Sequence, residues 1–514
     1  MNEQFLIKIL FTSDIHGYLL PINYADNSIS DRGLSILATE IKEHNKHNSI
    51  LLDLGDSIQG SPLMYFHKVN RRKYKNPVAT LFNYLKYDYF IPGNHDFNYG
   101  KNYLKDFVRN LNAKTLCQNV YLHNKLLFKN GFDIKTMENG FKILTIGVTT
   151  KYIPNWENPN HIKDYEFKDP YEETKKIIDR FKNQVNLIIL AYHGGFERDL
   201  LTGELYVDDT GENQGYKLFN DLEEVDILLT GHQHRRIAEK IGKRVVIQPG
   251  YNGSNLGLVE VSINKENEVL NIEPKLLSSQ DYKEDEKCRK LIGKIEKNNQ
   301  VFLDEIIGIV PDNNLEIKDP FLARKNKHPI VDFINYVQLK ATGAMLSATS
   351  LGNKVTGFKK QISIRNVLST YVYVNTLVVI EIDGLTLKEY LEKCAEYFVI
   401  IDGKITYNPT FAYPKFEHYN YDMIDGVDYT INVSNEFGNR IVSLKYQEKD
   451  VLDEDKFTLA LNNYRASGGG DFFMLKHCNI VKEIPLDVAE LLIDYIRTHK
   501  HLRIHTKNNI KIIK

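Results

Sequence analysis

The sequence of 514 residues has no apolar run near the length of about 20 residues that a membrane-spanning helix needs. Cysteine is also scarce: the four cysteines are Cys117, Cys288, Cys394 and Cys478, and no two of them form a C-x-x-C pair. For a chain of this length, that spacing favours reduced thiols over a disulfide framework.

The chain also has no excess of either charge, since it contains 66 lysines and arginines and 67 aspartates and glutamates. Proteins that bind nucleic acid polymers through their phosphates usually carry a basic excess, so we expect no nucleic acid polymer as a partner. The first residues lack the basic segment and the small-residue cleavage site of a secretory signal. We therefore expect a cytoplasmic protein that does not bind membranes; the oligomeric state is left open.

Short apolar runs alternate with amphipathic stretches along the first half. Predicted strands are 5–12, 49–54, 89–91, 142–148, 187–191, 227–229 and 245–248, and predicted helices are 34–45, 77–85 and 171–183. This alternation indicates a layered α/β structure. In the second half, amphipathic helices are predicted at 329–344 and 486–498.

A highly charged stretch at 281–300 has its few apolar residues at helical spacing. We interpret it as an exposed connecting helix, although a helix packed inside one domain is the alternative. A connecting helix here predicts a first domain at 1–278, a linker helix at 279–308 and a second domain at 309–514.

Five clusters of polar residues and glycine follow predicted strands, at 13–17, 54–57, 92–96, 191–195 and 231–234. Ligands of open α/β sheets bind at strand ends, so these clusters can converge on one sheet edge. Taken singly, each cluster is more often a helix cap, a turn or core packing. Five in a row favour a shared site.

The candidate ligands combine carboxylate, imidazole and amide groups: they are Asp14, His16, Asp56, Asn94, His193, His232 and His234. This mixture suits Mn, Fe, Co or Zn better than an all-oxygen Mg or Ca cage. Seven ligands are too many for one tetrahedral ion and fit two ions about 3.5–4 Å apart. Asp56 is the candidate bridging ligand, because Gly55 lets its backbone approach closely.

The order of these motifs resembles that of the calcineurin-like metallophosphoesterases. The segments FTSDIHG and GDSIQGSP are similar to the corresponding segments of the 5'-nucleotidase and 2',3'-cyclic-nucleotide phosphodiesterase family. The resemblance implies an α/β fold: an N-terminal four-layer αββα metallophosphoesterase domain, a linker helix and a C-terminal α+β nucleotide-binding domain. It also implies two divalent metal ions as cofactors, with Mn²⁺ or Zn²⁺ named first and Fe or Co as further candidates.

Carried over position by position, the resemblance assigns Asp14, His16, Asp56 and His234 to one metal, and Asp56, Asn94, His193 and His232 to the other. It places His95 on the catalytic histidine, which stabilises the charged phosphoryl group or protonates the leaving oxygen. We include Asp96 in the predicted catalytic pair. In the 5'-nucleotidases an aspartate three residues further on orients the histidine, whereas here that position is Asn98.

In the second half, aromatic and amide groups lie beside a glycine-rich turn at 468–470. Aromatic faces stack on nucleobases for roughly 1–3 kcal/mol, although tyrosines in strands more often pack a core. The resemblance assigns Tyr373 and Tyr464 to a base sandwich, Asn375 to a polar base contact and Asp471 to ribose binding, one position out of step. The Asn-Gly-Gly-Gly-x-Arg signature of 5'-nucleotidases is replaced by SATSLGNK at 347–354, which again favours the cyclic-phosphodiesterase branch.

The expected function is hydrolysis of nucleotide phosphoesters by water that two metal ions activate, with 2',3'-cyclic nucleotides and 3'-nucleotides or 5'-nucleotides as substrates. A broad 5'-nucleotidase, or a hydrolase of nucleotide sugars or dinucleotides, is the alternative enzyme. A non-catalytic nucleotide sensor is the alternative from another class. The retained ligand set argues against that sensor, because a decayed site should have lost some ligands.

Overall fold

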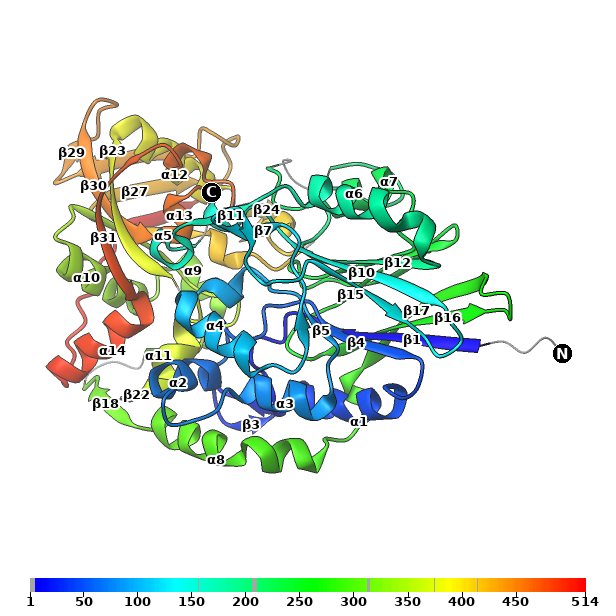
Figure 1. Cartoon of the computed structure of the whole chain (residues 1–514). Helices are drawn as coiled ribbons and strands as arrows, with labels where there is room; N and C mark the ends of the chain where they lie inside the picture. The colour runs from blue at the N-terminus through cyan, green and yellow to red at the C-terminus, as the bar shows by residue number, and fades with distance from the viewer. Residues whose placement is uncertain (1–4, 156, 206–209, 312–314, 374, 414) are drawn as a thin grey trace. The chain divides into compact units, whose positions relative to one another are not determined.

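The structure, a computed structural model, describes residues 5–155, 157–205, 210–311, 315–373, 375–413 and 415–514. The chain forms two compact units, a first unit up to Asn299 and a second unit from Gln300 (Figure 1). The division falls inside helix α8 (Glu286–Leu303), which overlaps the charged segment at 281–300.

Two six-stranded sheets form the first unit. One sheet has the order β17 (Val269–Ser278), β16 (Asn255–Ile263), β1 (Phe5–Thr12), β4 (Ser49–Asp53), β5 (Tyr89–Phe90) and β6 (Lys114–Thr115). The other has the order β14 (Arg236–Ile241), β15 (Arg244–Pro249), β13 (Ile227–Thr230), β12 (Leu187–His193), β10 (Lys142–Thr149) and β9 (Phe132–Thr136). The seven predicted strands are confirmed as β1, β4, β5, β10, β12, β13 and β15.

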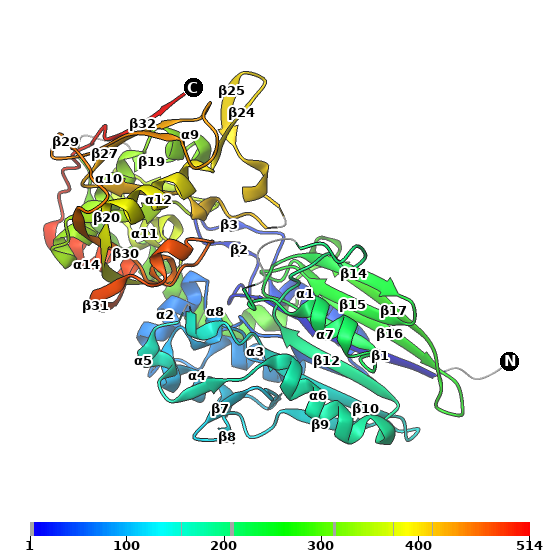
Figure 2. The ribbon, with the colours of Figure 1, turned by 90° about the horizontal axis from the view of Figure 1, so that it is seen from above.

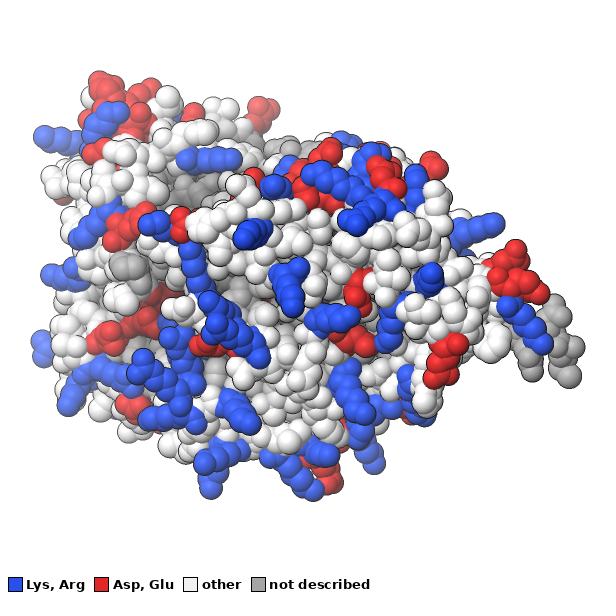
Figure 3. Space-filling view, in the orientation of Figure 1, with Lys and Arg blue, Asp and Glu red and all other residues white. Residues whose placement is uncertain are grey.

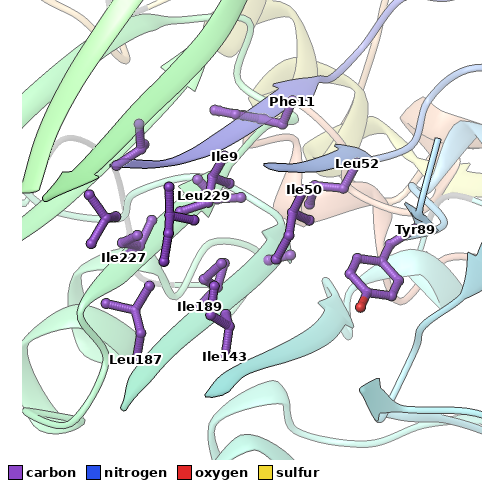
Figure 4. Packing of buried hydrophobic residues seen from close by; sticks show 14 of the residues in the cluster. Ile9, Phe11, Ile50, Leu52, Tyr89, Ile143, Leu187, Ile189, Ile227 and Leu229 are labelled. Carbon is purple, nitrogen blue, oxygen red and sulfur yellow. The ribbon is translucent and has the colours of Figure 1, made fainter. Parts of the chain in front are cut away.

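The two sheets pack face to face through alternate side chains. Ile9 of β1 and Ile50 of β4 meet Ile189 of β12 and Leu229 of β13 in this core, as Figure 4 shows. Because the side-chain period of a strand is two, the intervening residues point outward, where helices cover them. The core between the sheets is therefore the rigid base from which the strand ends project.

Helices cover the outer faces of both sheets. Helices α6 (Pro170–Phe181) and α7 (Gly215–Asp221) bury apolar side chains against β10, β12 and β13 (Figure 2). Helices α1 (Leu34–His44) and α3 (Pro77–Leu85) lie on the other side, next to the sheet that contains β1 (Figure 1). The four-layer αββα architecture expected from the resemblance is confirmed.

Parallel pairing brings the polar clusters to one edge of each sheet. In the first sheet β1, β4 and β5 run parallel, and in the second β10, β12, β13 and β15 do so. Their carboxyl ends therefore line up, and the five clusters lie at the ends of β1, β4, β5, β12 and β13. This topology explains how segments more than 200 residues apart reach one site, as His16 and His234 do.

The second unit is an α+β structure, as expected. Its main sheet has the order β26 (Asp422–Asp425), β20 (Leu346–Ser350), β30 (Lys456–Asn462), β23 (Thr376–Asp383) and β31 (Asn479–Asp487). A second sheet has the order β29 (Lys449–Asp450), β28 (Ile441–Tyr446), β27 (Asp428–Asn432) and β32 (Ile510–Ile513). The principal helices are α10 (Pro329–Thr342), α12 (Gly384–Ala395) and α14 (Val488–His499), of which α10 and α14 were predicted.

The four cysteines are free thiols, and only Cys478 is not fully buried. None of the helices in the described parts of the chain has the length and apolar character needed to cross a membrane. Figure 3 shows lysine and arginine side chains interspersed with acidic ones over the visible face. The cytoplasmic location remains a prediction.

Candidate metal centre

One group of facing ligand atoms consists of Asp14, His16 and His234. The Nε2 atoms of His16 and His234 lie 3.1 Å apart, and Asp14 Oδ1 lies 3.5 Å from His234 Nε2. Two neutral imidazoles that point ring nitrogens at each other can share only one proton, whereas both lone pairs can bind one cation. This geometry suits a metal ion.

The second group consists of Asp56, His193 and His232, and Asn94 lies among them. Asn94 Oδ1 lies 3.1 Å from His193 Nε2 and 2.9 Å from His232 Nδ1. His193 Nε2 is also 3.4 Å from Asp56 Oδ2. The structure thus brings all seven predicted ligand residues into two adjoining groups.

Several of these ligands have left-handed backbone conformations, which are rare outside glycine. Asp14 and Asp56 both have φ of 54°, and His232 has φ of 67°. Such conformations cost about 1–3 kcal/mol each and persist only where the surroundings enforce them. Here the ligand loops hold one another: Asp14 N–H donates to Gly55 O at 2.9 Å, and His232 N–H donates to Asp14 Oδ2 at 3.0 Å.

Glycine is required where the two loops of the first sheet meet. A Cβ atom on Gly93 would lie 2.3 Å from Asp56 Oδ1 and 2.5 Å from His193 Cε1. A Cβ atom on Gly55, whose φ is 85°, would lie 2.1 Å from the backbone nitrogen of Gly93. The glycines beside the predicted bridging carboxylate therefore allow a close approach that no other residue allows.

The carboxylates of the two candidate ligands Asp14 and Asp56 keep their negative charge. Burial opposes ionisation of Asp14, but the imidazoles of His234 and His193 outweigh it and lower the pKa of Asp14 to about 2. Burial also opposes ionisation of Asp56, and the facing His193 and His95 still hold its pKa well below the usual range. Burial lowers the pKa of His16, which favours the neutral imidazole that binds metals.

The ring nitrogens that face away from the groups have partners of their own. His16 Nδ1 contacts Gln59 O at 3.0 Å, and His193 Nδ1 contacts Leu54 O. His232 Nε2 lies 2.8 Å from the Glu212 carboxylate. Such partners fix the tautomer and orientation of metal-binding histidines. No local sequence pattern marks Glu212, because its role depends on a contact between residues 20 positions apart.

The donor set fits divalent cations. Two buried carboxylates, four imidazoles and one amide converge with their lone pairs inward, in two groups that adjoin. Borderline metals such as Mn, Fe, Co and Zn accept this mixture. The chain therefore has the residues for divalent metal ions, while the identity of the metal and the bridging role of Asp56 remain predictions.

His95 lies beside both groups. Its backbone N–H donates to Asp56 Oδ1 at 2.7 Å, and its ring centre is 5.5 Å from that of His16. On the other side, His95 Nδ1 lies 2.8 Å from Asn98 Oδ1. This position supports the predicted role of His95 at the phosphoryl group.

Asp96, which we expected to act with His95, has different contacts. Its carboxylate accepts four backbone N–H bonds, from Asp56, Ser57, Ile58 and Gly93, at 2.8 to 3.0 Å. Both oxygens are therefore engaged by the loops that carry the ligands. These contacts indicate that Asp96 holds the loops in place, and its catalytic role remains a prediction.

The predicted nucleoside-binding residues lie near one end of the neighbouring strands β23 and β30 in the second unit. Asn375 precedes β23, and Tyr464 follows β30; these ends are adjacent because Leu377 pairs with Asn462. Tyr373 packs edge-on against Tyr419, with ring centres 5.3 Å apart. The base sandwich between Tyr373 and Tyr464 remains a prediction.

Tyr464 is held by its surroundings. The next residue, Arg465, is buried and pairs with Asp422 at 2.6 Å, and its guanidinium also donates to the carbonyl of Gly469. A Cβ atom on Gly469 would lie 2.5 Å from the ring of Tyr464. The Arg465–Asp422 pair, which sequence reasoning missed, thus fixes the turn that contains Tyr464. Asp471 is exposed, with φ of 65°.

Two family profiles match the chain. The calcineurin-like phosphoesterase profile covers residues 7–236, and the profile of the 5'-nucleotidase C-terminal domain covers residues 312–477. A crystal structure from Staphylococcus aureus, described as a candidate 5'-nucleotidase in complex with alpha-ketoglutarate, is 33% identical with a TM-score of 0.92 and covers 99% of this chain and 100% of its own.

Curated relatives carry related names. The trifunctional nucleotide phosphoesterase protein YfkN of Bacillus subtilis is 27% identical over 99% of this chain, which spans only 39% of that protein. The 2',3'-cyclic-nucleotide 2'-phosphodiesterase/3'-nucleotidase of Haemophilus influenzae is 26% identical over 96% of this chain and 84% of its own length. With the convergent ligands and the two-unit fold, these matches show that the chain belongs to the calcineurin-like metallophosphoesterases that carry a 5'-nucleotidase C-terminal domain.

Proposed function

We propose that this metallophosphoesterase hydrolyses nucleotide phosphoesters with two divalent metal ions, and that 2',3'-cyclic nucleotides and 3'-nucleotides are its preferred substrates. The observation that carries the proposal is the convergence of seven ligand residues beside His95. When bound, divalent cations at these groups lower the pKa of water towards about 7 and neutralise phosphoryl oxygens.

The residues of the chain have separate tasks in this proposal. Asp14 and Asp56 supply the negative charge that retains the cations, and the glycine-lined loops keep the carboxylates close. His95 donates a hydrogen bond or a proton to the phosphoryl group or to the leaving oxygen. In the second unit, Tyr373, Asn375, Tyr464 and Asp471 bind the base and ribose, for which aromatic stacking and polar contacts are suited.

The preference for cyclic substrates is supported by two departures from the 5'-nucleotidase pattern. Asn98 stands where those enzymes have an aspartate, and the segment 347–354 lacks their arginine signature. The name of the Haemophilus influenzae relative agrees with this branch. Relatives named 5'-nucleotidase and NAD 5'-nucleotidase also cover nearly the whole chain, so hydrolysis of 5'-nucleotides or dinucleotides is the second candidate.

Metal analysis of the purified protein, followed by a substrate panel with that metal, tests the proposal. We expect 2',3'-cyclic AMP and 3'-AMP to be cleaved faster than 5'-AMP and UDP-glucose. A hundredfold preference for 5'-AMP would contradict the branch. No turnover of any substrate, combined with nucleotide binding, would favour the non-catalytic sensor.

Two variants test the assigned roles. Asp56→Ala should abolish turnover and reduce metal content, because it removes a ligand. His95→Ala should lower kcat by about 10²- to 10⁴-fold, the usual effect of losing a general acid or base, with nearly unchanged metal content. Equal residual activity in both variants would mean that the roles are wrong.

A further inference from the structure

A chain of hydrogen bonds leads from His95 to a buried glutamate that the mechanism has not used. His95 Nδ1 lies 2.8 Å from Asn98 Oδ1, and Asn98 Nδ2 donates to Glu157 Oε2 at 2.7 Å. The other oxygen, Glu157 Oε1, accepts from Asn158 N–H at 2.7 Å and lies 2.9 Å from His161 Nδ1. Only 5% of the Glu157 side chain is exposed.

The chemistry of these groups decides which atom donates in each of these hydrogen bonds. A carboxylate only accepts hydrogen bonds, whereas the asparagine amide donates at one end and accepts at the other. Glu157 therefore draws the NH₂ group of Asn98 towards itself and turns the Asn98 oxygen towards His95. Because that oxygen can only accept, His95 Nδ1 carries a hydrogen. Nε2 is the ring nitrogen left for the phosphoryl group, and it donates there when the ring carries a second hydrogen.

We propose that Glu157 is a positioning residue for His95 and acts through Asn98, an inference that rests on the proposed function. In this chain the carboxylate that orients the histidine is one side chain further out than the aspartate of the 5'-nucleotidases. Asn98 transmits the orientation because its amide has two different ends. His95 is thus held from two sides, by Asp56 through its backbone and by Glu157 through its ring.

Replacing the carboxylate by an amide breaks this order. In Glu157→Gln, the glutamine oxygen is needed by the Asn158 N–H, so the glutamine NH₂ group faces the NH₂ group of Asn98. Relief requires Asn98 to turn over, which presents a donor to His95 Nδ1. The ring then cannot carry hydrogens on both nitrogens, as it must if it is to give up the Nε2 proton and stay neutral. Misoriented catalytic groups cost up to about 10²-fold, so we expect kcat to fall by about 10- to 100-fold with little change in KM or metal content.

Exchanging the two groups provides the sharpest test. Asn98→Asp alone brings two carboxylates together and should also slow the enzyme. In the double variant Asn98→Asp/Glu157→Gln, the glutamine donates to the aspartate and the aspartate again accepts from His95 Nδ1. Activity should then return to within about threefold of the wild type, a recovery expected only of residues that act as one coupled unit.

Glu40→Gln is the matched control. Glu40 is also a buried glutamate, with a histidine four residues further on, and its Oε2 lies 3.0 Å from His44 Nε2. That pair is on α1 and touches none of the predicted site residues. We expect Glu40→Gln to leave kcat unchanged, and we expect Glu157→Gln to add no further loss to His95→Ala.

The tautomer of His95 can be read without substrate. In ¹⁵N-labelled protein, the Nδ1–H form should be present in the wild type and in the exchanged double variant, and depleted in Glu157→Gln. The His95 signals are assigned by their loss in His95→Ala. Wild-type turnover by Glu157→Gln, no recovery in the double variant, or an unchanged tautomer would each overturn the inference. If the wild type cleaves no nucleotide, the proposed function fails and the tautomer still decides this point.

Discussion

Asp53 is an acid buried at the end of β4, three residues before the predicted bridging ligand Asp56. Its carboxyl group accepts from Ser57 Oγ and Thr12 Oγ1, both at 2.6 Å, and from Gly55 N at 2.9 Å. Burial raises the pKa of Asp53 to about 8 despite these bonds. Tyr87 Oη lies 2.9 Å from Thr12 Oγ1, so Thr12 can donate to Tyr87 and accept a hydrogen bond from the protonated acid.

We therefore predict that the stability of Asp53→Asn relative to the wild type increases as the pH rises. The folded pKa lies above the unfolded one, so the stability that Asp53 contributes is complete below about pH 4 and is lost as the pH rises through about 8. The asparagine does not titrate. The difference in free energy of unfolding should grow by at most about 1.4 kcal/mol per pH unit in this window.

Calorimetry of metal-loaded wild type and Asp53→Asn at several pH values between 5 and 8 measures this difference. The amide keeps both uses of the acid, since its oxygen accepts from Gly55 and Ser57 and its NH₂ group donates to Thr12. A constant difference in Tm across the pH range would show that Asp53 is ionised in the folded protein.

At the residue scale, the sequence predicted ligands better than their supports. Asp14 and His16 stand out because they follow a strong apolar run, and His232 and His234 repeat the same spacing. Glu157 and Glu212 lie in loops with no local pattern, and each acquires its role from a partner 59 or 20 positions away. Motif position also does not reveal that four backbone N–H groups engage Asp96, whose catalytic assignment remains a prediction.

At the scale of elements, local signals decided which segments could be predicted. Helix α3 begins after Asn76, whose side chain accepts from Ala79 N–H, and has proline at its first position. Both signals are readable in the sequence, and the predicted bounds 77–85 are those observed. In contrast, β17 is largely exposed and contains Pro274, so it lacks the apolar run that revealed the other strands. Its place comes from pairing with β16.

Helix α6 allows a prediction at this scale. Its N-cap, Asp169, accepts from Tyr171 N–H at 2.9 Å and pairs with Lys151 Nζ at 2.7 Å. Burial opposes the ionisation of Asp169, but Lys151 outweighs it and lowers the pKa. Asp169→Ala removes the cap and should cost about 1–2 kcal/mol, whereas Asp169→Asn keeps the accepting oxygen and should cost less.

Denaturant unfolding of the two variants at pH 7 measures these costs. The lowered pKa means that the contribution of the ion pair is present above the unfolded pKa of about 4 and is lost as the pH falls below it. Wild type and Asp169→Asn should therefore converge at low pH. Equal costs for alanine and asparagine would show that the ion pair matters and the cap does not.

At the scale of the whole molecule, the two units have different reasons to be stable. The candidate metal ligands all lie in the first unit, where Asp14 and Asp56 are buried charges held close together. The second unit has its own buried ion pair, Arg465 with Asp422, and its own sheets. Cations should therefore stabilise the first unit selectively.

We predict that a chelator lowers the unfolding temperature of one transition and leaves the other in place. A ligand at a hundred times its Kd stabilises the folded state by about 2.7 kcal/mol, which amounts to a few degrees for a unit of this size. Differential scanning calorimetry with Mn²⁺, with Zn²⁺ and with a chelator separates the two transitions. Asp56→Ala should show a smaller shift between metal and chelator, because it lacks a ligand.

The transition that moves can be assigned independently. Arg465→Met removes the charge partner of Asp422 in the second unit and should lower the other transition, because a buried carboxylate left unpaired typically costs about 3–5 kcal/mol. If the chelator and Arg465→Met shift the same transition, the units unfold as one and metal binding stabilises the whole chain. If the chelator shifts neither transition, the two ligand groups hold no cation, and the proposed metal-dependent hydrolysis is wrong.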